Sequence, residues 1–275
     1  MYDNEHPLGW LEYFLLPNTS VLYKPVFLCS AYRSKIKKPT LVKNDLTKYT
    51  DEALILKKTG DTVVTNNRLK GIKFIENISC QKNYNVIIMD DGLQNYTIKK
   101  YISFLIVDKE MMFGNGLCMP AGPLRQKLNS CINAVDKIIL IGNENKKISI
   151  SKFDKKKYSC AIKLNLKGVS YNDKKFFAFS GLAYNLKFFN SLIKENINVK
   201  ITKEFSDHYI YKKKDIIKLI KISDKNNLNL VTTEKDFVKI PKEFHKKIGF
   251  VPIKVEFKKN DLLDLKSYLK KKLNA

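Results

Sequence analysis

The chain has 275 residues, of which 44% are hydrophobic, which is enough for one large α/β domain or two of ordinary size. Its formal net charge of +24 comes from 48 lysines and only three arginines. Arginine is the residue that contacts phosphates and guanine bidentately, so its scarcity argues against nucleic acid as a partner. A lysine-rich surface of this kind is expected to be drawn to anionic lipid.

The cysteines exclude two further classes of protein. They are five in number, widely spaced and without a CxxC pair: Cys29, Cys80, Cys118, Cys131 and Cys160. This pattern is typical of thiols in a reduced, cytosolic compartment, and predicts neither a disulfide framework nor a zinc site. No apolar stretch reaches the roughly 18 residues that a membrane-spanning helix needs.

Residues 1–24 are unusually apolar and aromatic. The stretch "HPLGWLEYFLLPNTSVLYKPVFL" contains the only tryptophan of the chain and is broken by Pro17 and Pro25. It lacks the basic start and the cleavage site of a signal peptide. Two interpretations stay open: a helix in a membrane interface, or a segment that packs on the following domain.

The next elements follow the rhythm of a parallel sheet. "TDEALILKKTG" predicts a helix that starts at Thr50 or Asp51 and stops at Gly60. "DTVVTNN", "NVIIMDD", "SFLIVD" and "KIILIG" predict short buried strands, separated by helices or loops. We therefore expect an α/β fold with a parallel sheet.

The character of the chain changes after Lys152. "KFDKKKYSCAIKLNLKGVS" is charged and then alternates, as an exposed ribbon does. A second α/β series follows, from "KFFAFSG" to "GFVPIKVEF", and a lysine-rich helix ends the chain. We predict three parts: an interfacial segment, 1–24, a first α/β domain, 25–170, and a smaller second one, 171–275.

Two acids stand at the end of a predicted buried strand. Asp90 and Asp91 directly follow the apolar run Val86–Met89. Open α/β sheets place their ligand crevice at the carboxyl ends of the strands, and an acid there holds Mg²⁺ in phosphoryl-transfer enzymes. Paired acids at such a place are costly unless something cationic meets them.

Two other places carry candidate site residues. "FGNGLCMPAGPLRQ" packs three glycines and two prolines around Arg125, so it is either a loop that brings the backbone to an anion or a turn-rich connector. In "FSDHYIY", His208 follows Asp207 in a polar turn before a helix, and is catalytic or structural. Asp51 and Glu52 begin a helix, where acids also offset the helix dipole.

Five stretches together resemble one family. "TDEAL", "DDGLQ", "FGNGLCMPAGPLR", "FSDHYIY" and "TTEKDFVK" occur in this order, and the chain is similar to tetraacyldisaccharide 4'-kinases over about residues 6 to 257. The resemblance implies a membrane-associated P-loop kinase with two α/β domains joined by a β-ribbon. It implies ATP-dependent phosphorylation of the 4'-hydroxyl of a tetraacylated glucosamine disaccharide 1-phosphate, a step of lipid A and lipopolysaccharide biosynthesis in Gram-negative bacteria.

The resemblance also implies roles for particular residues. Asp51 is similar to the general base that takes the proton of the sugar hydroxyl, His208 to its partner, with Asp207 beside it. Asp90 and Asp91 are similar to the acids at the Mg²⁺ site. Arg125, Asp91 and Glu52 are the residues that we expect near ATP. The implied partners are the acylated disaccharide and the inner membrane surface, with a peripheral location on the cytoplasmic face.

One part of the family pattern is missing from the sequence. No GxxxxGK[ST] phosphate loop occurs anywhere in the 275 residues. The resemblance places the gap near Lys24–Pro25, where the family has a first strand, the loop and its helix. We therefore expect an exposed sheet edge or a hole in the core, and weak ATP binding. The alternative function is an inactive or lipid-surface-binding member of the family.

Overall fold

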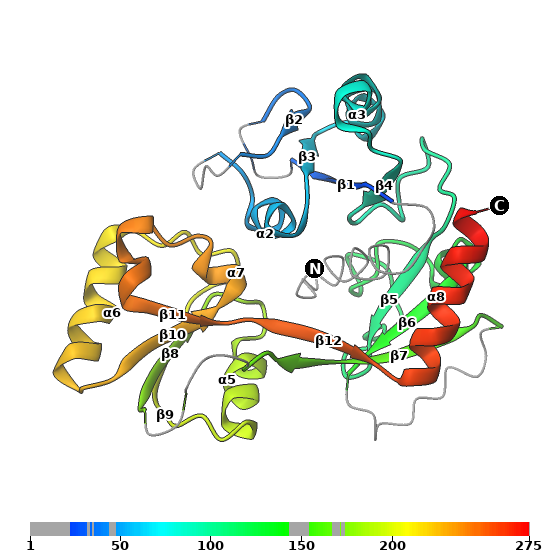
Figure 1. The fold of residues 1–275 in the computed structure, drawn as a ribbon. Coiled ribbons are helices and arrows are strands. Elements are labelled where there is room, and N and C mark those ends of the chain that lie inside the picture. The colour runs from blue at the N-terminus through cyan, green and yellow to red at the C-terminus, as the bar shows by residue number, and fades with distance from the viewer. Residues whose placement is uncertain are drawn as a thin grey trace.

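The computed structural model describes residues 23–31, 34, 36–43, 48–142, 154–166, 171 and 174–274. Nearly all of the predicted interfacial segment, residues 1–24, lies outside the described residues. The described strands form three four-stranded sheets, each with helices packed on it (Figure 1). None of the described helices is long and apolar enough to cross a bilayer.

The first sheet is built around strand β1, whose first five residues are buried. Its order is β2-β3-β1-β4, with β3 and β4 parallel to β1. Alternate residues of β1 contact opposite layers: Phe27 and Cys29 pack with helix α2, whereas Val26 and Leu28 pack with helix α3. The bounds are β1 Pro25–Ser30, β2 Thr40–Leu41, α2 Asp51–Thr59, β3 Thr62–Thr65, α3 Arg68–Lys82 and β4 Val86–Met89.

The second sheet continues the α/β pattern and ends in an antiparallel pair. Its order is β12-β7-β6-β5, where β5, β6 and β7 are parallel and β12 runs against β7. Helix α8 covers it, because Leu265 and Leu269 pack with Ile139 and Tyr158. The bounds are β5 Phe104–Asp108, α4 Leu128–Asn133, β6 Lys137–Ile141, β7 Lys157–Leu164, β12 Ile253–Phe257 and α8 Lys259–Leu273.

The third sheet is entirely parallel, in the order β11-β10-β8-β9. Helix α5 packs on one face through Phe188 and Leu192, and helix α6 on the other through Ile216 and Leu219. The bounds are β8 Phe176–Ser180, α5 Asn185–Lys194, β9 Val199–Glu204, α6 Lys213–Lys225, β10 Asn229–Thr233, α7 Glu234–Phe237, the 3-10 helix η1 Lys242–Lys247 and β11 Ile248–Val251. The predicted α/β class with a second α/β unit is confirmed.

A two-stranded ribbon connects the two halves of the molecule. β7 leads into the third sheet and β12 returns from it, and the two pair from Cys160–Phe257 to Leu164–Ile253 (Figure 1). "GFVPIKVEF" thus forms two strands, divided at Pro252, which has no backbone N–H to donate. Residues 253–273, which a boundary near residue 170 assigns to the second domain, pack on the sheet of the first half.

Two strands end their sheets beside the same cleft. Among the described residues, β4 has a strand partner only in β1, and β5 only in β6. Val86–Met89 and Phe104–Val107 line one cavity, and most of their side chains are half-buried, whereas those of Pro25–Cys29 are buried. Among the described residues β4 and β5 are thus edge strands, and an exposed sheet edge is what the absence of the family's first strand predicts.

Candidate active site

A single cleft of about 2890 Å³ collects the predicted site residues. It is lined from both halves of the molecule: by strand ends of the first two sheets, by helix α5 and by the segment that follows β9. All seven candidates contribute to its wall: Asp51, Glu52, Asp90, Asp91, Arg125, Asp207 and His208. The sequence motifs therefore converge in space although they are spread along the chain.

Asp51 is held at the first position of α2. Thr50 caps the helix, since its side-chain oxygen accepts a hydrogen bond from the amide of Ala53. Asp51 Oδ1 accepts from the amide of Glu52. The side chain is 5% exposed, so Asp51 is a nearly buried carboxylate at the positive end of a helix.

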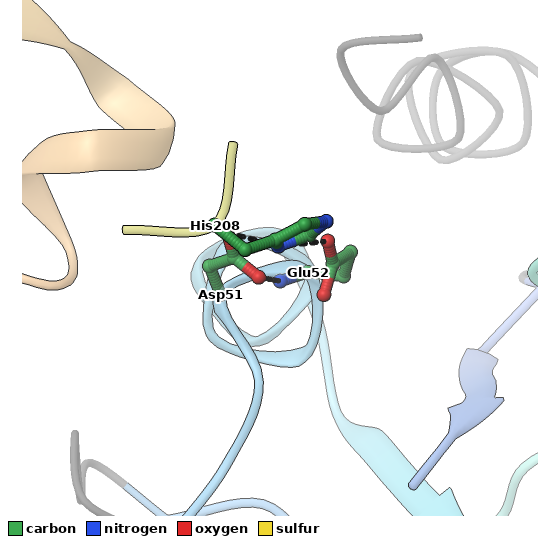
Figure 2. A group of neighbouring side chains, drawn as sticks. All are labelled: Asp51, Glu52 and His208. Atoms are coloured by element: carbon green, nitrogen blue, oxygen red, sulfur yellow. Dashed lines mark hydrogen bonds and ion pairs between the residues drawn. The ribbon is translucent and has the colours of Figure 1, made fainter. Parts of the chain in front are cut away.

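His208 reaches Asp51 from the other half of the molecule. Its Nδ1 lies 3.2 Å from Asp51 Oδ2 and 3.6 Å from Glu52 Oε1, so both carboxylates face one imidazole (Figure 2). The backbone of His208 has a φ of 54°, in the left-handed region that residues other than glycine adopt rarely. Asp207 Oδ1 accepts from the His208 amide, and its Oδ2 lies 3.8 Å from Nε2. The Asp51–His208 approach that the resemblance predicts is present.

Two lysines that sequence reasoning did not single out complete this group. Lys235 Nζ lies 3.5 Å from Glu52 Oε1, and Lys239 Nζ lies 3.7 Å from Asp51 Oδ2. Both side chains are largely buried, with 5% and 12% exposed. They belong to "TTEKDFVK", but nothing in that stretch indicates that it crosses to α2.

A buried carboxylate anchors the second lysine. Asp236 is fully buried, and its Oδ1 lies 2.8 Å from Lys239 Nζ and accepts a hydrogen bond from the Tyr211 hydroxyl. Its Oδ2 accepts from the Gly181 amide and from Thr233. Burial, together with the charge of Asp236 and this hydrogen bond, raises the pKa of Tyr211 far above its usual value, so the tyrosine stays a donor.

Asp90 and Asp91 lie at the end of β4, opposite the glycine-rich loop. Arg125 donates to Asp91 Oδ2 at 2.7 Å, in a pair that is partly exposed to solvent. Arg68, a residue that we did not predict, fixes this strand end by donating to the carbonyls of Leu28 and Asp90. The sequence distinguishes Arg68 only by residue type, since it is one of three arginines in the chain.

Hydrogen bonds within the loop Phe113–Gln126 hold its shape. Asn115 donates to the carbonyl of Ala121, and the amide of Gly122 to that of Cys118. A Cβ at Gly122 would lie 2.4 Å from the carbonyl oxygen of Leu117, so only glycine fits there. This packing places Arg125 beside Asp91.

The group of Asp51, Glu52 and His208 also has the composition of a metal site. Their ligand atoms lie within 4.8 Å of one another. The ammonium groups of Lys235 and Lys239 already supply positive charge to the two acids. This arrangement therefore suits proton transfer at Asp51 better than binding of a further cation.

Comparison with known proteins identifies the family. The family model for tetraacyldisaccharide-1-P 4'-kinase matches residues 18–274. The chain belongs to this family. A tetraacyldisaccharide 4'-kinase of Rickettsia bellii is 35% identical over 217 residues, which cover 78% of this chain and 66% of the relative. One of Rickettsia akari is 33% identical over 253 residues, which cover 89% of this chain and 74% of the relative.

The fold has a solved counterpart. A crystal structure of LpxK from Aquifex aeolicus in complex with ATP superposes with a TM-score of 0.74 at 20% identity, over 97% of this chain and 82% of that one. At this identity the comparison supports the fold alone. It agrees with the P-loop-kinase-like architecture that the sequence predicted.

Proposed function

We propose that this chain carries the acceptor side of a lipid A 4'-kinase site, which phosphorylates the 4'-hydroxyl of a tetraacylated glucosamine disaccharide 1-phosphate with ATP. The observation that carries the proposal is the 3.2 Å approach of His208 to Asp51 in the shared cleft. The family name and the kinase names of the relatives support the reaction class.

Asp51 acts as the general base in this proposal. It accepts the proton of the 4'-hydroxyl while that oxygen bonds to the γ-phosphorus and the bond to the bridging oxygen of ADP breaks, so ADP carries away the electron pair. His208 orients the carboxylate and shares the proton, and Asp207 holds the imidazole from its other side. Glu52 adds a second carboxylate to the imidazole.

The donor side of the proposed site lies around the end of β4. Asp90 and Asp91 would hold Mg²⁺, which typically binds one or two carboxylates together with phosphate oxygens. Arg125 is partly exposed beside Asp91 and would face the phosphates. The metal would neutralise the charge that develops on the transferred group.

The absence of a GxxxxGK[ST] run supports a second candidate. A phosphate loop supplies backbone N–H groups, a lysine and a magnesium ligand from one short segment, and no such segment occurs in the 275 residues. The second candidate is therefore an inactive member of the family that keeps the lipid-facing surface. In either case we infer a peripheral location on the cytoplasmic face of the inner membrane, and an acylated disaccharide as ligand.

A transfer assay separates the two candidates. The purified chain is incubated with tetraacyldisaccharide 1-phosphate and radiolabelled Mg-ATP at millimolar concentration, with the Rickettsia bellii relative as the positive control. An active chain transfers label, and Asp51→Asn lowers the rate about 10²–10⁴-fold, as expected for loss of a general base. Label transfer by the relative alone would favour the inactive candidate.

The Asp51 assignment needs a control for charge. Asp61→Asn removes a carboxylate just beyond the end of α2. In the unmodified chain this carboxylate lies 2.7 Å from Lys57 Nζ and accepts a hydrogen bond from the Tyr84 hydroxyl. Asp61 is absent from the wall of the cleft. We expect this variant to retain the rate of the unmodified chain, and equal losses in both variants would contradict the role of Asp51.

A further inference from the structure

Segment 234–239 forms a charged bridge between the two halves of the molecule. Helix α7 packs on the third sheet, yet side chains of α7 and of the residues after it form ion pairs with α2, the helix that packs on the first sheet. Three contacts make the bridge: Glu234 with Lys58 at 2.9 Å, Lys235 with Glu52 at 3.5 Å and Lys239 with Asp51 at 3.7 Å. The outer pair is partly exposed, and the inner two lysines are largely buried.

The inner contact joins two polar atoms that are incompletely satisfied. Within the described part of the chain, buried Asp51 Oδ2 and buried Lys239 Nζ make ion pairs but no hydrogen bond of good geometry. They carry opposite charges and lie 3.7 Å apart, each with hydrogen-bonding capacity left. A buried polar group of this kind is costly unless a further partner completes it.

We propose that Lys239 is a positioning residue for Asp51: anchored on Asp236, it holds Oδ2 of Asp51 toward the acceptor hydroxyl, and Lys235 holds the carboxylate of Glu52 in place. This proposal rests on the proposed function, because it assigns Asp51 as the base.

The physical reason is the charge balance of the cleft. Three carboxylates face His208, from Asp51, Glu52 and Asp207, and an imidazolium alone balances one charge. A carboxylate as buried as Asp51 is costly unless cationic partners lie close to it. The position of Lys239 is fixed independently of Asp51, because its Nζ lies 2.8 Å from Asp236 Oδ1. Asp236 is itself held by hydrogen bonds from Gly181, Thr233 and Tyr211.

Titration of His208 tests this role without requiring activity. The chain has only three histidines, so the full chain labelled at histidine gives separable imidazole signals in an NMR pH titration. Lys239→Met removes the cation that competes with His208 for Asp51. We expect the midpoint of the His208 titration to rise by about half to one pH unit, because Asp51 then faces the imidazolium without the competing ammonium group.

The matched control is Lys58→Met. It removes one lysine from the same bridge, but this lysine pairs with Glu234 and not with the two acids. We expect no change of the His208 midpoint. If Lys239→Met does not fold by circular dichroism, Lys239→Gln replaces it, because an amide can still donate to Asp236. An unchanged or lower midpoint in a folded Lys239 variant would overturn the proposal.

A third variant distinguishes this proposal from the proposed function. Asp51→Asn should lower the His208 midpoint, because it removes the nearest carboxylate. No shift in Asp51→Asn would mean that the Asp51–His208 pair does not form in solution, and the proposed function would lose its main support. A shift in Asp51→Asn with none in the Lys239 variant would overturn the role of Lys239 alone.

Discussion

Asp236 is a single buried residue that supports the site indirectly, through its ion pair with Lys239. Its two oxygens receive one main-chain amide, two hydroxyls and one ammonium group. A fully buried carboxylate is tolerated only when such partners are present. Removal of one partner should therefore weaken folding and also loosen Lys239.

Tyr211→Phe tests this at the residue scale. The substitution removes one hydrogen bond to a buried charge and leaves the ring in its aromatic cluster. We expect the free energy of unfolding to fall by about 1.5–3 kcal/mol, the usual value for a hydrogen bond to a charged group. Urea unfolding followed by circular dichroism measures it. Tyr209→Phe is the control: its hydroxyl bonds Asp215 near the surface, and little change is expected. A Tyr211 variant as stable as the control would contradict the anchoring role.

Single residues also show what the sequence can and cannot reveal. Asp51 and His208 could be named because each lies in a short stretch with a recognisable pattern. Lys235 and Lys239 could not, because a lysine among 48 carries no local signal. Their role depends on where α7 lies relative to α2, and that is a property of tertiary packing.

At the scale of elements, strands were the most predictable feature. "NVIIMDD" and "KIILIG" became β4 and β6 because apolar, β-branched runs suit buried strands. The return of β12 and α8 to the second sheet was not predicted, since a ribbon that leaves a sheet and comes back has no local pattern. Edge strands beside the cleft could be expected only through the resemblance, which places a missing strand near Lys24–Pro25.

The contact between β5 and α5 gives a prediction about pH. Lys187 Nζ lies 2.7 Å from Asp108 Oδ2. Burial raises the pKa of Asp108, but hydrogen bonds from Lys187 and from the amides of Glu110 and Met111 outweigh it and lower the pKa below its usual value. A lowered folded pKa means that this stabilisation is present above the unfolded pKa, near 3.9, and is lost as the pH falls through the folded value.

Lys187→Met should therefore destabilise the protein at neutral pH. Lys187 is half exposed, so solvent screening limits the expected loss to about 0.5–1 kcal/mol. The difference from the unmodified chain should shrink as the pH is lowered from 5 through the lowered pKa of Asp108, because the carboxylate that Lys187 pairs with is then protonated. Urea unfolding across this range measures it, with Lys194→Met, an exposed lysine at the end of the same helix, as the control. A difference that is independent of pH would refute the Asp108 linkage.

For the whole molecule, the open edges and the missing motif bear on nucleotide affinity. Among the described strands, β4 and β5 each have one neighbour, and the 275 residues contain no GxxxxGK[ST] phosphate loop. We expect the chain to bind Mg-ATP with a Kd in the millimolar range or weaker, about −4 kcal/mol or less favourable. Isothermal titration calorimetry, with the Rickettsia bellii relative as reference, measures this. Micromolar affinity would show that other residues hold the phosphates.

The charge and the amino-terminal segment together predict how the whole molecule meets a membrane. The sequence offers Trp10, Tyr13 and Phe14 in one short apolar stretch, on a chain with net charge +24. An apolar anchor and basic charge are two signals that together give stable peripheral binding. We expect association with anionic vesicles that weakens as salt rises, because surface charge is screened within about 8 Å at physiological ionic strength.

A truncation separates the anchor from the charge. Tyr23 is buried in the first core and Lys24 pairs through its amide with Asn85, so the deletion should stop at residue 22. If residues 1–22 act as the anchor, the truncated chain folds and keeps only the salt-sensitive part of vesicle binding, measured by sedimentation. If they pack on the domain instead, the deletion causes unfolding or insolubility, visible by circular dichroism. Equal vesicle binding by two folded chains would end the anchor hypothesis and leave charge as the only attraction.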